Sequence, residues 1–405
     1  MSARRLKISM QNKNKEDYIV IISSVPFPYG NASDNAIYTF MDGFQEHGCK
    51  GEVLCLYPNL PEQYDEVKAS GSFKGVEYKY LLGRCHPYQN KYQKSFAYRF
   101  LTSYRLKFYL IRKAKRYNVT ALFIMHVNDK FYEYTQICHK CGVKVVQVGC
   151  EYPEYLIEDT EARRQTYRRL SQHIDKYVFE TKTLDEYEKN VLGKDIVSIV
   201  VPATMPVDDI LDKKKENVKP YIAYSGSVHS DAKDGLSNII KGYAKFHESH
   251  PGVDLKFIGR VSNKAYYEEL QKQIKDMSLE DSISFTKEVA REEYVRMMNN
   301  AKLMVVAKPK DSYYGGGLSS KVIEYLFSGN PILMTDSDDY VNYLTHNINV
   351  FFVHDNDPDT LADALYELFS SPEKMQAIGE EGRQYAMEHF NYHKTTKGLL
   401  SFILE

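Results

Sequence analysis

The stretch DSYYGGGLSSKVIEYLFSGNP, residues 311–331, joins three consecutive glycines to a short apolar segment. Apolar residues recur at helical spacing over 322–327, and Gly329 and Pro331 end the pattern, which predicts a glycine-rich loop that opens a helix. Glycines let a ligand approach the backbone closely, and the first N–H groups of a helix lack internal partners and carry the positive end of the helix dipole. The stretch therefore predicts a phosphate site at a helix N-terminus.

Short β-branched or aromatic runs alternate with longer amphipathic segments along the rest of the chain. This alternation predicts an α/β protein with parallel sheets covered by helices, in two similar Rossmann-like halves. The candidate strands of the first half are 18–24, 52–57, 76–82, 120–126, 143–149, 175–180 and 196–201. Those of the second half are 220–226, 253–259, 281–286, 302–307, 331–335 and 349–353, with helices between them such as 234–248 and 264–277.

The boundary between the halves is predicted from a charged stretch without a core-forming period at 206–219. We therefore expect a first domain over 1–205, a linker over 206–219 and a second domain over 220–388. A C-terminal helix over 389–405 is expected to pack back on the first domain. In open α/β sheets, ligands bind beyond the carboxyl ends of the strands, so the strand-to-helix loops should carry the function.

Composition excludes several classes of protein. The chain has 53 basic and 54 acidic residues, so its bulk charge points to no polyanionic partner. No apolar run reaches the roughly 18 residues of a membrane-spanning helix, and the polar start at 1–17 lacks a signal-peptide core, which predicts a cytoplasmic protein. The cysteines are scattered, and the C-x-x-C pair Cys138 and Cys141 has no second pair, so we expect reduced thiols rather than a metal or redox site.

The motifs of the second half form a recognisable series. In chain order they are Gly226-Ser227, Lys233-Asp234-Gly235, Lys256 to Gly259, Ile283 to Phe285, and Lys321 to Pro331. With this order and spacing the chain resembles retaining glycosyltransferases of the GT-B fold, most closely those of family 4, over about residues 220–390. The first half resembles them only through Gly30 and its strand–helix rhythm.

The resemblance implies two Rossmann-like domains that face each other across an interdomain cleft, with the acceptor on the first domain and the donor on the second. It implies transfer of a sugar from a nucleotide diphosphate sugar to the hydroxyl of a glycan or lipid-linked acceptor, in cell-surface polysaccharide or glycolipid assembly. It calls for no metal and no cofactor. The acidic run from Asp336 to Asp339 imitates a metal-binding D-x-D motif, but we expect it to be a solvated loop.

The donor site follows from the family's E-x(7)-E motif, whose second carboxylate accepts hydrogen bonds from the donor ribose. Glu324 matches that position, whereas Gly316 stands where the first carboxylate is expected. The backbone amides near Gly317, Leu318 and Ser319 are predicted to hold the diphosphate. The plainer alternative for Glu324 is a surface ion pair with Lys321, one helical turn away.

Cations are also expected at the diphosphate, where the family has an Arg and a Lys. Ser227 replaces the Arg, Lys233 matches the Lys, and Lys321 is a further candidate on the opening helix. Each charge-assisted contact contributes about 1.5–3 kcal/mol. Gly30, Lys233 and Lys321, with the helix amides, would stabilise the leaving diphosphate.

The catalytic His of many family members has no clear counterpart. The strand that should precede it is followed by Cys150-Glu151-Tyr152-Pro153-Glu154, so Glu151 or Glu154 is a candidate to orient the acceptor hydroxyl, and His126 is another. The two glutamates could equally be surface acids.

A basic and aromatic segment marks the acceptor half. Residues 78–128 contain no Asp or Glu, while Lys, Arg, Tyr and Phe alternate over 91–117. Such a face suits an anionic membrane, and the alternative is a solvated helix whose aromatic side chains pack inward. No nucleic-acid-binding motif accompanies it, so no nucleic acid partner is expected.

Two other functions fit the same motifs. A different GT-B enzyme, such as a nucleotide-sugar epimerase, would share the fold but not the pattern from Lys321 to Pro331. A non-catalytic sugar-nucleotide or glycan-binding protein is the alternative outside enzymes, because the departures at Ser227 and Gly316 are those of an inactive relative.

Overall fold

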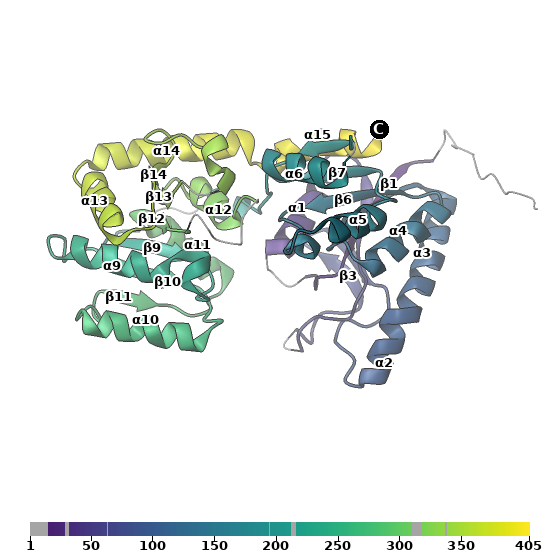
Figure 1. Cartoon of the computed structure of the whole chain (residues 1–405), viewed down its shortest axis with the longest axis horizontal. Coiled ribbons are helices and arrows are strands. Elements are labelled where there is room, and N and C mark those ends of the chain that lie inside the picture. The colour runs from purple at the N-terminus through teal and green to yellow at the C-terminus, as the bar shows by residue number, and fades with distance from the viewer. Residues whose placement is uncertain are drawn as a thin grey trace, which may run out of the picture. The chain divides into compact units, whose positions relative to one another are not determined.

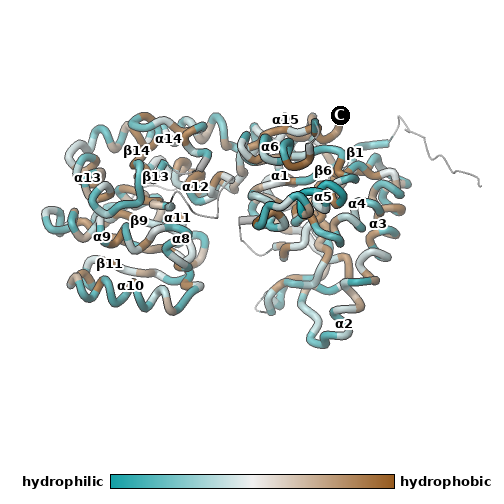
Figure 2. Tube along the Cα trace, in the orientation of Figure 1, coloured by the Kyte–Doolittle hydropathy of each residue, from teal (hydrophilic) through white to brown (hydrophobic). Residues whose placement is uncertain are grey.

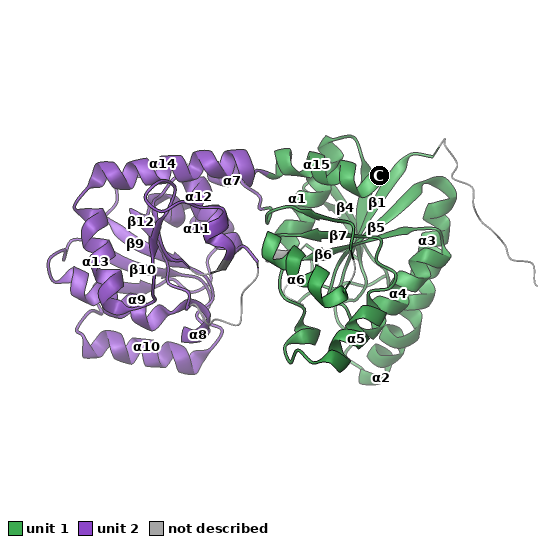
Figure 3. Ribbon diagram, turned by 45° about the horizontal axis from the view of Figure 1, so that its top comes forward, with its two compact units in different colours: residues 1–204, 392–405 green, residues 205–391 purple. Residues whose placement is uncertain are grey.

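The computed structural model describes residues 15–28, 32–62, 64–193, 195–211, 216–309, 317–336 and 338–405. It divides into two compact units, shown in Figure 3. Unit 1 comprises residues 1–204 and 392–405, and unit 2 comprises residues 205–391. In both units, helices lie on the two sides of a central sheet (Figure 1).

Unit 1 contains an eight-stranded sheet in the order β3-β4-β2-β1-β5-β6-β7-β8, which is parallel except for the edge pair β3 and β4. Its strands are β1 (Asp17–Ser23), β2 (Lys50–Cys55), β3 (Ser70–Phe73), β4 (Val76–Tyr80), β5 (Asn118–Ile124), β6 (Lys144–Gly149), β7 (Lys176–Phe179) and β8 (Ser198–Val200). Its helices are α1 (Ala32–Glu46), α2 (Lys91–Phe96), the π-helix η1 (Ala97–Leu101), α3 (Thr102–Arg116), α4 (Asp129–Lys140), the 3-10 helix η2 (Glu154–Leu156), α5 (Glu161–Leu170), α6 (Lys182–Leu192) and α15 (Tyr392–Leu404).

Both faces of the unit 1 sheet are covered. Successive residues of β1 belong to different cores: Ile19 and Ile21 pack with α1 and α15, whereas Val20 and Ile22 pack with α3 and α4. Side chains of a strand alternate between the two faces of its sheet, so a strand with helices on both sides is apolar throughout. This explains the uninterrupted apolar run that predicts β1 from the sequence.

Unit 2 contains a six-stranded parallel sheet in the order β11-β10-β9-β12-β13-β14. Its strands are β9 (Tyr221–Ser225), β10 (Asp254–Ile258), β11 (Ile283–Phe285), β12 (Leu303–Val306), β13 (Ile332–Thr335) and β14 (Phe351–Val353). Its helices are α7 (Asp208–Leu211), α8 (Asp231–Asp234), α9 (Leu236–His247), α10 (Lys264–Asp276), α11 (Arg291–Asn300), α12 (Ser320–Ser328), the 3-10 helix η3 (Asp338–Asn342), α13 (Pro358–Phe369) and α14 (Pro372–His389).

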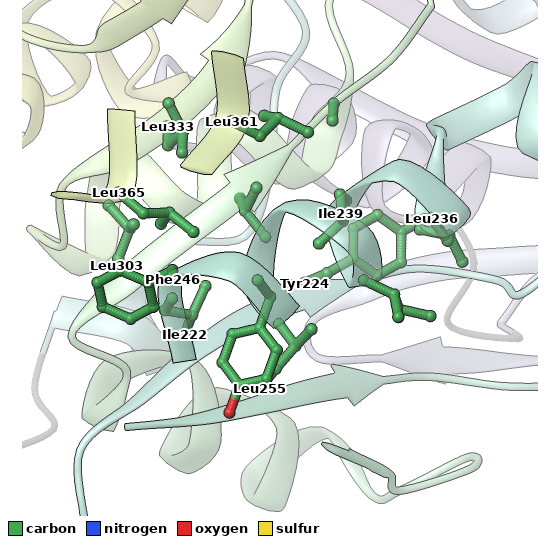
Figure 4. Close-up of a cluster of buried hydrophobic side chains, with 14 of the residues drawn as sticks. Ile222, Tyr224, Leu236, Ile239, Phe246, Leu255, Leu303, Leu333, Leu361 and Leu365 are labelled. Carbon is green, nitrogen blue, oxygen red and sulfur yellow. The ribbon is translucent and has the colours of Figure 1, made fainter. Parts of the chain in front are cut away.

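The core of unit 2 joins the sheet to the helices α9 and α13. Figure 4 shows Ile222, Leu255 and Leu303 of the strands against Phe246 of α9 and Leu365 of α13. The hydropathy colouring of Figure 2 shows the same division along the chain, because hydrophobic stretches lie in the strands while the helices carry hydrophilic residues on their outer sides. In the described part of the chain, no helix is long and apolar enough to cross a membrane.

The strand predictions are confirmed, since each lies within two residues of an observed strand at both ends. The sequence missed β3, because its residues Ser-Gly-Ser-Phe are short and polar and pair only at the sheet edge. The predicted helix 234–248 was wrong at its start. Gly235 adopts a left-handed φ of 64°, which ends α8 and lets α9 begin at Leu236.

The predicted linker 206–219 includes α7, which packs against α11 and α12 of unit 2. Asn299 donates a hydrogen bond to the carbonyl of Ile210, 3.2 Å away, and Asp209 forms an ion pair with Arg291. The helix therefore forms part of the packing around the site described next.

Candidate functional site

The glycine-rich stretch that predicted a phosphate site is described from Gly317 onward. Gly30 and Gly316 lie outside the described residues. Gly317, Leu318 and Ser319 lead into α12, and Leu318 is buried. The Ser319 amide donates a hydrogen bond to the Tyr340 hydroxyl at 2.5 Å. One of the amides predicted for the diphosphate therefore has an internal partner in this structure.

Glu324 lies in the interior of unit 2, not on its surface. Its side chain is 7% exposed, and its two oxygens are held from α11: one forms an ion pair with Arg291, and the other accepts a hydrogen bond from the Tyr294 hydroxyl at 2.8 Å. The alternative of a surface pair with Lys321 is wrong, because Lys321 pairs with Asp234 instead.

Arg291 bridges two carboxylates. Besides Glu324, its guanidinium contacts Asp209 through Nε at 2.7 Å and Nη2 at 3.1 Å. Burial opposes the charge on Arg291, but the two carboxylates outweigh it and raise its pKa. A planar guanidinium holds both partners in a fixed geometry, so Glu324 is oriented by α11 and, through Asp209, by α7.

Lys321 is held in a second polar cluster. Its Nζ lies 2.5 Å from Asp234, whose other oxygen accepts a hydrogen bond from the Tyr224 hydroxyl at 2.8 Å. Burial lowers the pKa of Lys321, and the nearby charges of Lys233 and Lys308 lower it further. For Asp234, burial raises the pKa, but Lys321 more than compensates and the pKa is lowered. Lys233 and Lys308 thus lie close enough to Lys321, on α12, for their charges to act on it.

Ser227, which replaces the family's Arg, lies apart from this pairing. Its hydroxyl shares a hydrogen bond of 2.5 Å with the Ser262 hydroxyl. The structure places it at the end of β9, and it supplies no charge there.

A pocket of about 260 Å³ lies at the carboxyl ends of β9 and β10. Its lining includes Ser225, Gly226, Gly259, Tyr294, Lys321 and Glu324. Gly226 and Gly259 have φ of 148° and 141°, and a Cβ on Gly259 would lie 2.3 Å from the Gly226 carbonyl oxygen. Only glycines allow this close backbone approach, which forms the floor of the pocket.

The acceptor-side candidates gather in unit 1, at the carboxyl ends of β5 and β6. His126 and Glu151 line a pocket of about 200 Å³, and His126 and Glu154 line a neighbouring pocket of about 320 Å³. The His126 Nε2 lies 3.9 Å from Glu154 Oε1, and both side chains are more than half exposed. The structure brings the three residues together, and their catalytic roles stay predictions.

Comparison with known proteins identifies the class of this site. Residues 208–385 match the family model described as Glycosyl transferases group 1, which spans unit 2 and its pocket. The chain is a glycosyltransferase of the GT-B fold.

One sequence relative and two solved structures of similar fold match this glycosyltransferase over nearly its whole length. An uncharacterized glycosyltransferase of Methanocaldococcus jannaschii is 20% identical over 374 residues, which cover 89% of this chain and 92% of the relative. HepE of Anabaena has a TM-score of 0.71 at 11% identity, covering 96% of this chain and 99% of that chain. Sucrose-phosphate synthase of Thermosynechococcus elongatus has a TM-score of 0.68 at 13% identity, covering 95% and 98%.

Sequence reasoning missed Tyr294, which lines the donor-side pocket. It also missed two residues that act on the pocket lining: Arg291, which pairs with Glu324, and Lys308, whose charge lowers the pKa of Lys321. Arg291 and Tyr294 begin an ordinary polar helix, and nothing in their spacing relates them to Glu324, which is about 30 residues away in the chain. Lys308 follows β12, so its position at the carboxyl end of a predicted strand was the signal that could have found it.

Proposed function

We propose that this protein is a retaining glycosyltransferase of family 4, which transfers a sugar from a nucleotide diphosphate sugar to an acceptor hydroxyl. The observation that carries the proposal is the pocket at the ends of β9 and β10, where an oriented carboxylate, Glu324, and a lysine, Lys321, line the same space. Structures of HepE with UDP and glucose, and with UDP-glucose, support a nucleotide sugar as the donor.

Two groups on the pocket lining, Glu324 and Lys321, suit the ribose and the diphosphate of a nucleoside diphosphate. Glu324 accepts hydrogen bonds from the ribose hydroxyls, which compete with the Tyr294 hydroxyl for its oxygens. Lys233 and Lys321 attract the diphosphate, together with the amides of Gly317 and Leu318 at the start of α12.

Sugar transfer needs the leaving diphosphate to be stabilised as the glycosidic bond breaks. The lysines and the helix N-terminus present positive charge where negative charge develops, so their contribution is larger in the transition state than in the bound donor. On the acceptor side, we propose that Glu151, Glu154 or His126 orients the acceptor hydroxyl.

The proposal is tested by donor-dependent transfer and by donor binding. A thermal-shift screen of UDP-, GDP- and ADP-sugars should find at least one that stabilises the wild type. Glu324→Ala should lose that stabilisation and at least tenfold in kcat/KM for the donor, whereas Glu269→Ala, exposed on α10, should behave as wild type. Unchanged transfer by the Glu324→Ala variant would contradict the assignment. Donor binding without transfer to any acceptor would favour a non-catalytic binding protein.

A second proposal concerns where the enzyme works. A row of exposed aromatic side chains runs along α2, η1 and α3 at intervals of four residues: Tyr92, Phe96, Phe100, Tyr104 and Phe108, each at least 54% exposed. Residues four apart drift by about 40° around an α-helix. The π turn of η1 reduces this drift, because each of its residues advances through a smaller angle, and so helps to keep the row on one side.

The chemistry of this face suits an anionic membrane. Exposed cations, among them Lys91, Lys94, Arg99 and Lys107, accompany the aromatic row, and residues 78–128 contain no acid. The inward-facing side of α3 is occupied by Leu106 and Leu110, so the exposed aromatics are not its core contacts. Aromatic side chains insert at the headgroup level, and each basic residue adds about 1 kcal/mol of attraction. We therefore propose a cytoplasmic enzyme that binds the inner membrane face peripherally and serves polysaccharide or glycolipid assembly.

Liposome sedimentation tests this second proposal. Wild type should sediment with vesicles of anionic lipid and not with neutral vesicles. Phe96→Ser/Phe100→Ser and Lys91→Gln/Lys94→Gln/Lys107→Gln should each weaken binding at least fivefold. The matched control neutralises three lysines of α10, Lys264, Lys272 and Lys275, and should leave binding unchanged. Equal binding to anionic and neutral vesicles would contradict this proposal.

A further inference from the structure

The strongest unassigned feature is the interior of the unit 1 pocket that has His126 and Glu151 on its lining. Its inner wall is formed by Gln147 of β6, Tyr177 and Phe179 of β7, Tyr167 of α5, and Glu188 of α6. Its volume of about 200 Å³ is several times the roughly 30 Å³ that one water occupies in the liquid. The pocket is therefore larger than the site of a single structural water.

Gln147 presents one oxygen without a protein partner. Its side chain is buried, and Nε2 donates hydrogen bonds to the carbonyl of Met125 at 3.0 Å and to that of Val148 at 2.7 Å. These two acceptors fix the orientation of the amide. Its Oε1 has no hydrogen-bond partner among the described residues.

Glu188 presents a second such oxygen. The residue is 5% exposed, and Oε1 accepts a hydrogen bond from the Tyr167 hydroxyl at 2.8 Å. Its Oε2 is buried and has no hydrogen-bond partner within the part of the chain that the structure describes. The Tyr177 hydroxyl, on the same lining, is a third buried polar atom without a hydrogen-bond partner among the described residues. Folded proteins leave few such atoms unpaired, so three on the lining of one pocket indicate a polar ligand, and the two acceptor oxygens indicate that it donates hydrogen bonds there.

The walls between these oxygens are aromatic. Tyr167, Tyr177 and Phe179 line the pocket beside Gln147 and Glu188. A sugar ring combines apolar C–H faces, which pack on aromatic rings, with hydroxyl groups, which donate to carboxylate and amide oxygens. A small apolar pocket with a few convergent polar groups is the usual form of a site for such a ligand.

We propose that this pocket binds one monosaccharide unit of the acceptor, and that Glu188 and Gln147 select it by accepting hydrogen bonds from two of its hydroxyls. The assignment of the ring to an acceptor rests on the proposed function, because His126 and Glu151, the candidates to orient the acceptor hydroxyl, line the same pocket. If the pocket binds a sugar ring of the acceptor, the acceptor is a glycan, free or lipid-linked, rather than a lipid alcohol alone.

Ligand-observed saturation-transfer NMR on the full chain tests the pocket directly. The probes are methyl glycosides of glucose, galactose, mannose, N-acetylglucosamine and rhamnose. Wild type should bind at least one of them, and Glu188→Gln and Gln147→Leu should each raise its Kd at least tenfold. The matched control, Glu186→Gln, changes an exposed carboxyl two residues away on α6 and should keep the wild-type Kd. Thermal unfolding checks that every variant is folded.

Two outcomes would overturn the proposal: binding of none of the glycosides by wild type, or equal Kd values for Glu188→Gln, Gln147→Leu and Glu186→Gln. Donor stabilisation, measured on the same proteins, separates this failure from failure of the proposed function. Glu188→Gln should retain the wild-type thermal shift with the nucleotide sugar, because donor binding is assigned to unit 2. Glycoside binding lost in the pocket variants, without any donor response, would support the pocket and contradict the donor assignment.

Discussion

At the scale of single residues, the donor-side pocket depends on how Glu324 is held. A buried carboxylate needs a charged or hydrogen-bonding partner, and Glu324 has both in Arg291 and Tyr294. Arg291 acts on the proposed ribose contact through another side chain, so we regard it as a positioning residue.

Replacing Arg291 with Met should therefore destabilise unit 2 and weaken donor binding. We expect a loss of about 1–3 kcal/mol, below the 3–5 kcal/mol of a fully buried pair, because the guanidinium is 39% exposed. The donor KM should rise more than kcat falls. Chemical denaturation and donor titration measure both effects, and Arg291→Lys should recover part of the stability but little of the donor affinity. A donor KM equal to that of the wild type in both variants would contradict a positioning role.

Glu188 predicts a dependence of stability on pH. Burial raises its pKa from 4.5 in the unfolded chain to about 7 in the folded protein, so the folded state favours the protonated acid. The stabilisation is complete below pH 4.5 and is lost as the pH rises through 7. Glu188→Gln has no carboxyl group to ionise, so its stability should not fall with pH in this way. Between pH 5 and pH 8 its free energy of unfolding should rise by up to about 3 kcal/mol relative to that of the wild type. Chemical denaturation of both proteins at pH 5 and pH 8 measures the difference in their free energies of unfolding. The same difference at both pH values would show that Glu188 does not titrate in this range.

At the scale of elements, the carboxyl ends of β9 and β10 are joined by backbone contacts that only glycines permit. The Gly226 peptide group lies where a Cβ on Gly259 would be, and the Tyr224 hydroxyl lies where a Cβ on Gly226 would be. The pocket floor is thus a property of two strand ends together, not of either loop.

Gly259→Ala should accordingly be strongly destabilising. The new Cβ would lie 2.3 Å from the Gly226 carbonyl oxygen, at a φ that L-residues rarely adopt. We expect a loss of about 2 kcal/mol or more and weaker donor binding. Gly252→Ala, in the turn before β10, is the matched control because no atom lies within 4 Å of its new Cβ. Similar thermal unfolding of the two variants would refute the close approach.

At the scale of the whole molecule, the chain ends in the unit where it began. The final helix α15 belongs to unit 1, where Tyr392 donates a hydrogen bond to Asp42 of α1 at 2.8 Å and Leu399 packs in the same core as β1. The helix therefore packs against α1 and β1, which lie more than 300 positions earlier in the sequence.

Leu399→Ala should lower the stability of unit 1 by about 2–5 kcal/mol, because it removes a fully buried side chain and leaves a cavity. Hydrogen exchange should show faster opening of α1 and β1, with β9 and β10 of unit 2 unaffected. Lys397→Ala, exposed on the same helix, should change neither. Faster exchange in both units of Leu399→Ala would contradict an effect confined to unit 1.

The sequence predicted most of the local structure because strands and helices follow from short-range patterns. Uninterrupted apolar runs such as that of β1 mark strands covered on both faces, and a glycine such as Gly329, at a left-handed φ of 71°, marks a helix end. The two wrong predictions, the missing strand β3 and the start of α9, also follow from the reliance on short-range patterns. A polar edge strand such as β3 carries too weak a pattern, and Gly235 divides a helical pattern that looks continuous.

By itself, the sequence determined the α/β class, the positions of the predicted strands, the glycine-rich entry to α12 and the likeness to GT-B glycosyltransferases. Only the tertiary structure decided which side chains lie together. It pairs Arg291 with Glu324 and Lys321 with Asp234, and it places the unpaired oxygens of Gln147 and Glu188 on the lining of one pocket. The physical reason is range. The patterns that predict strands and helices extend over about ten consecutive residues. A buried ion pair or a pocket joins residues that are distant in the sequence, and only sheet order and helix packing bring them together.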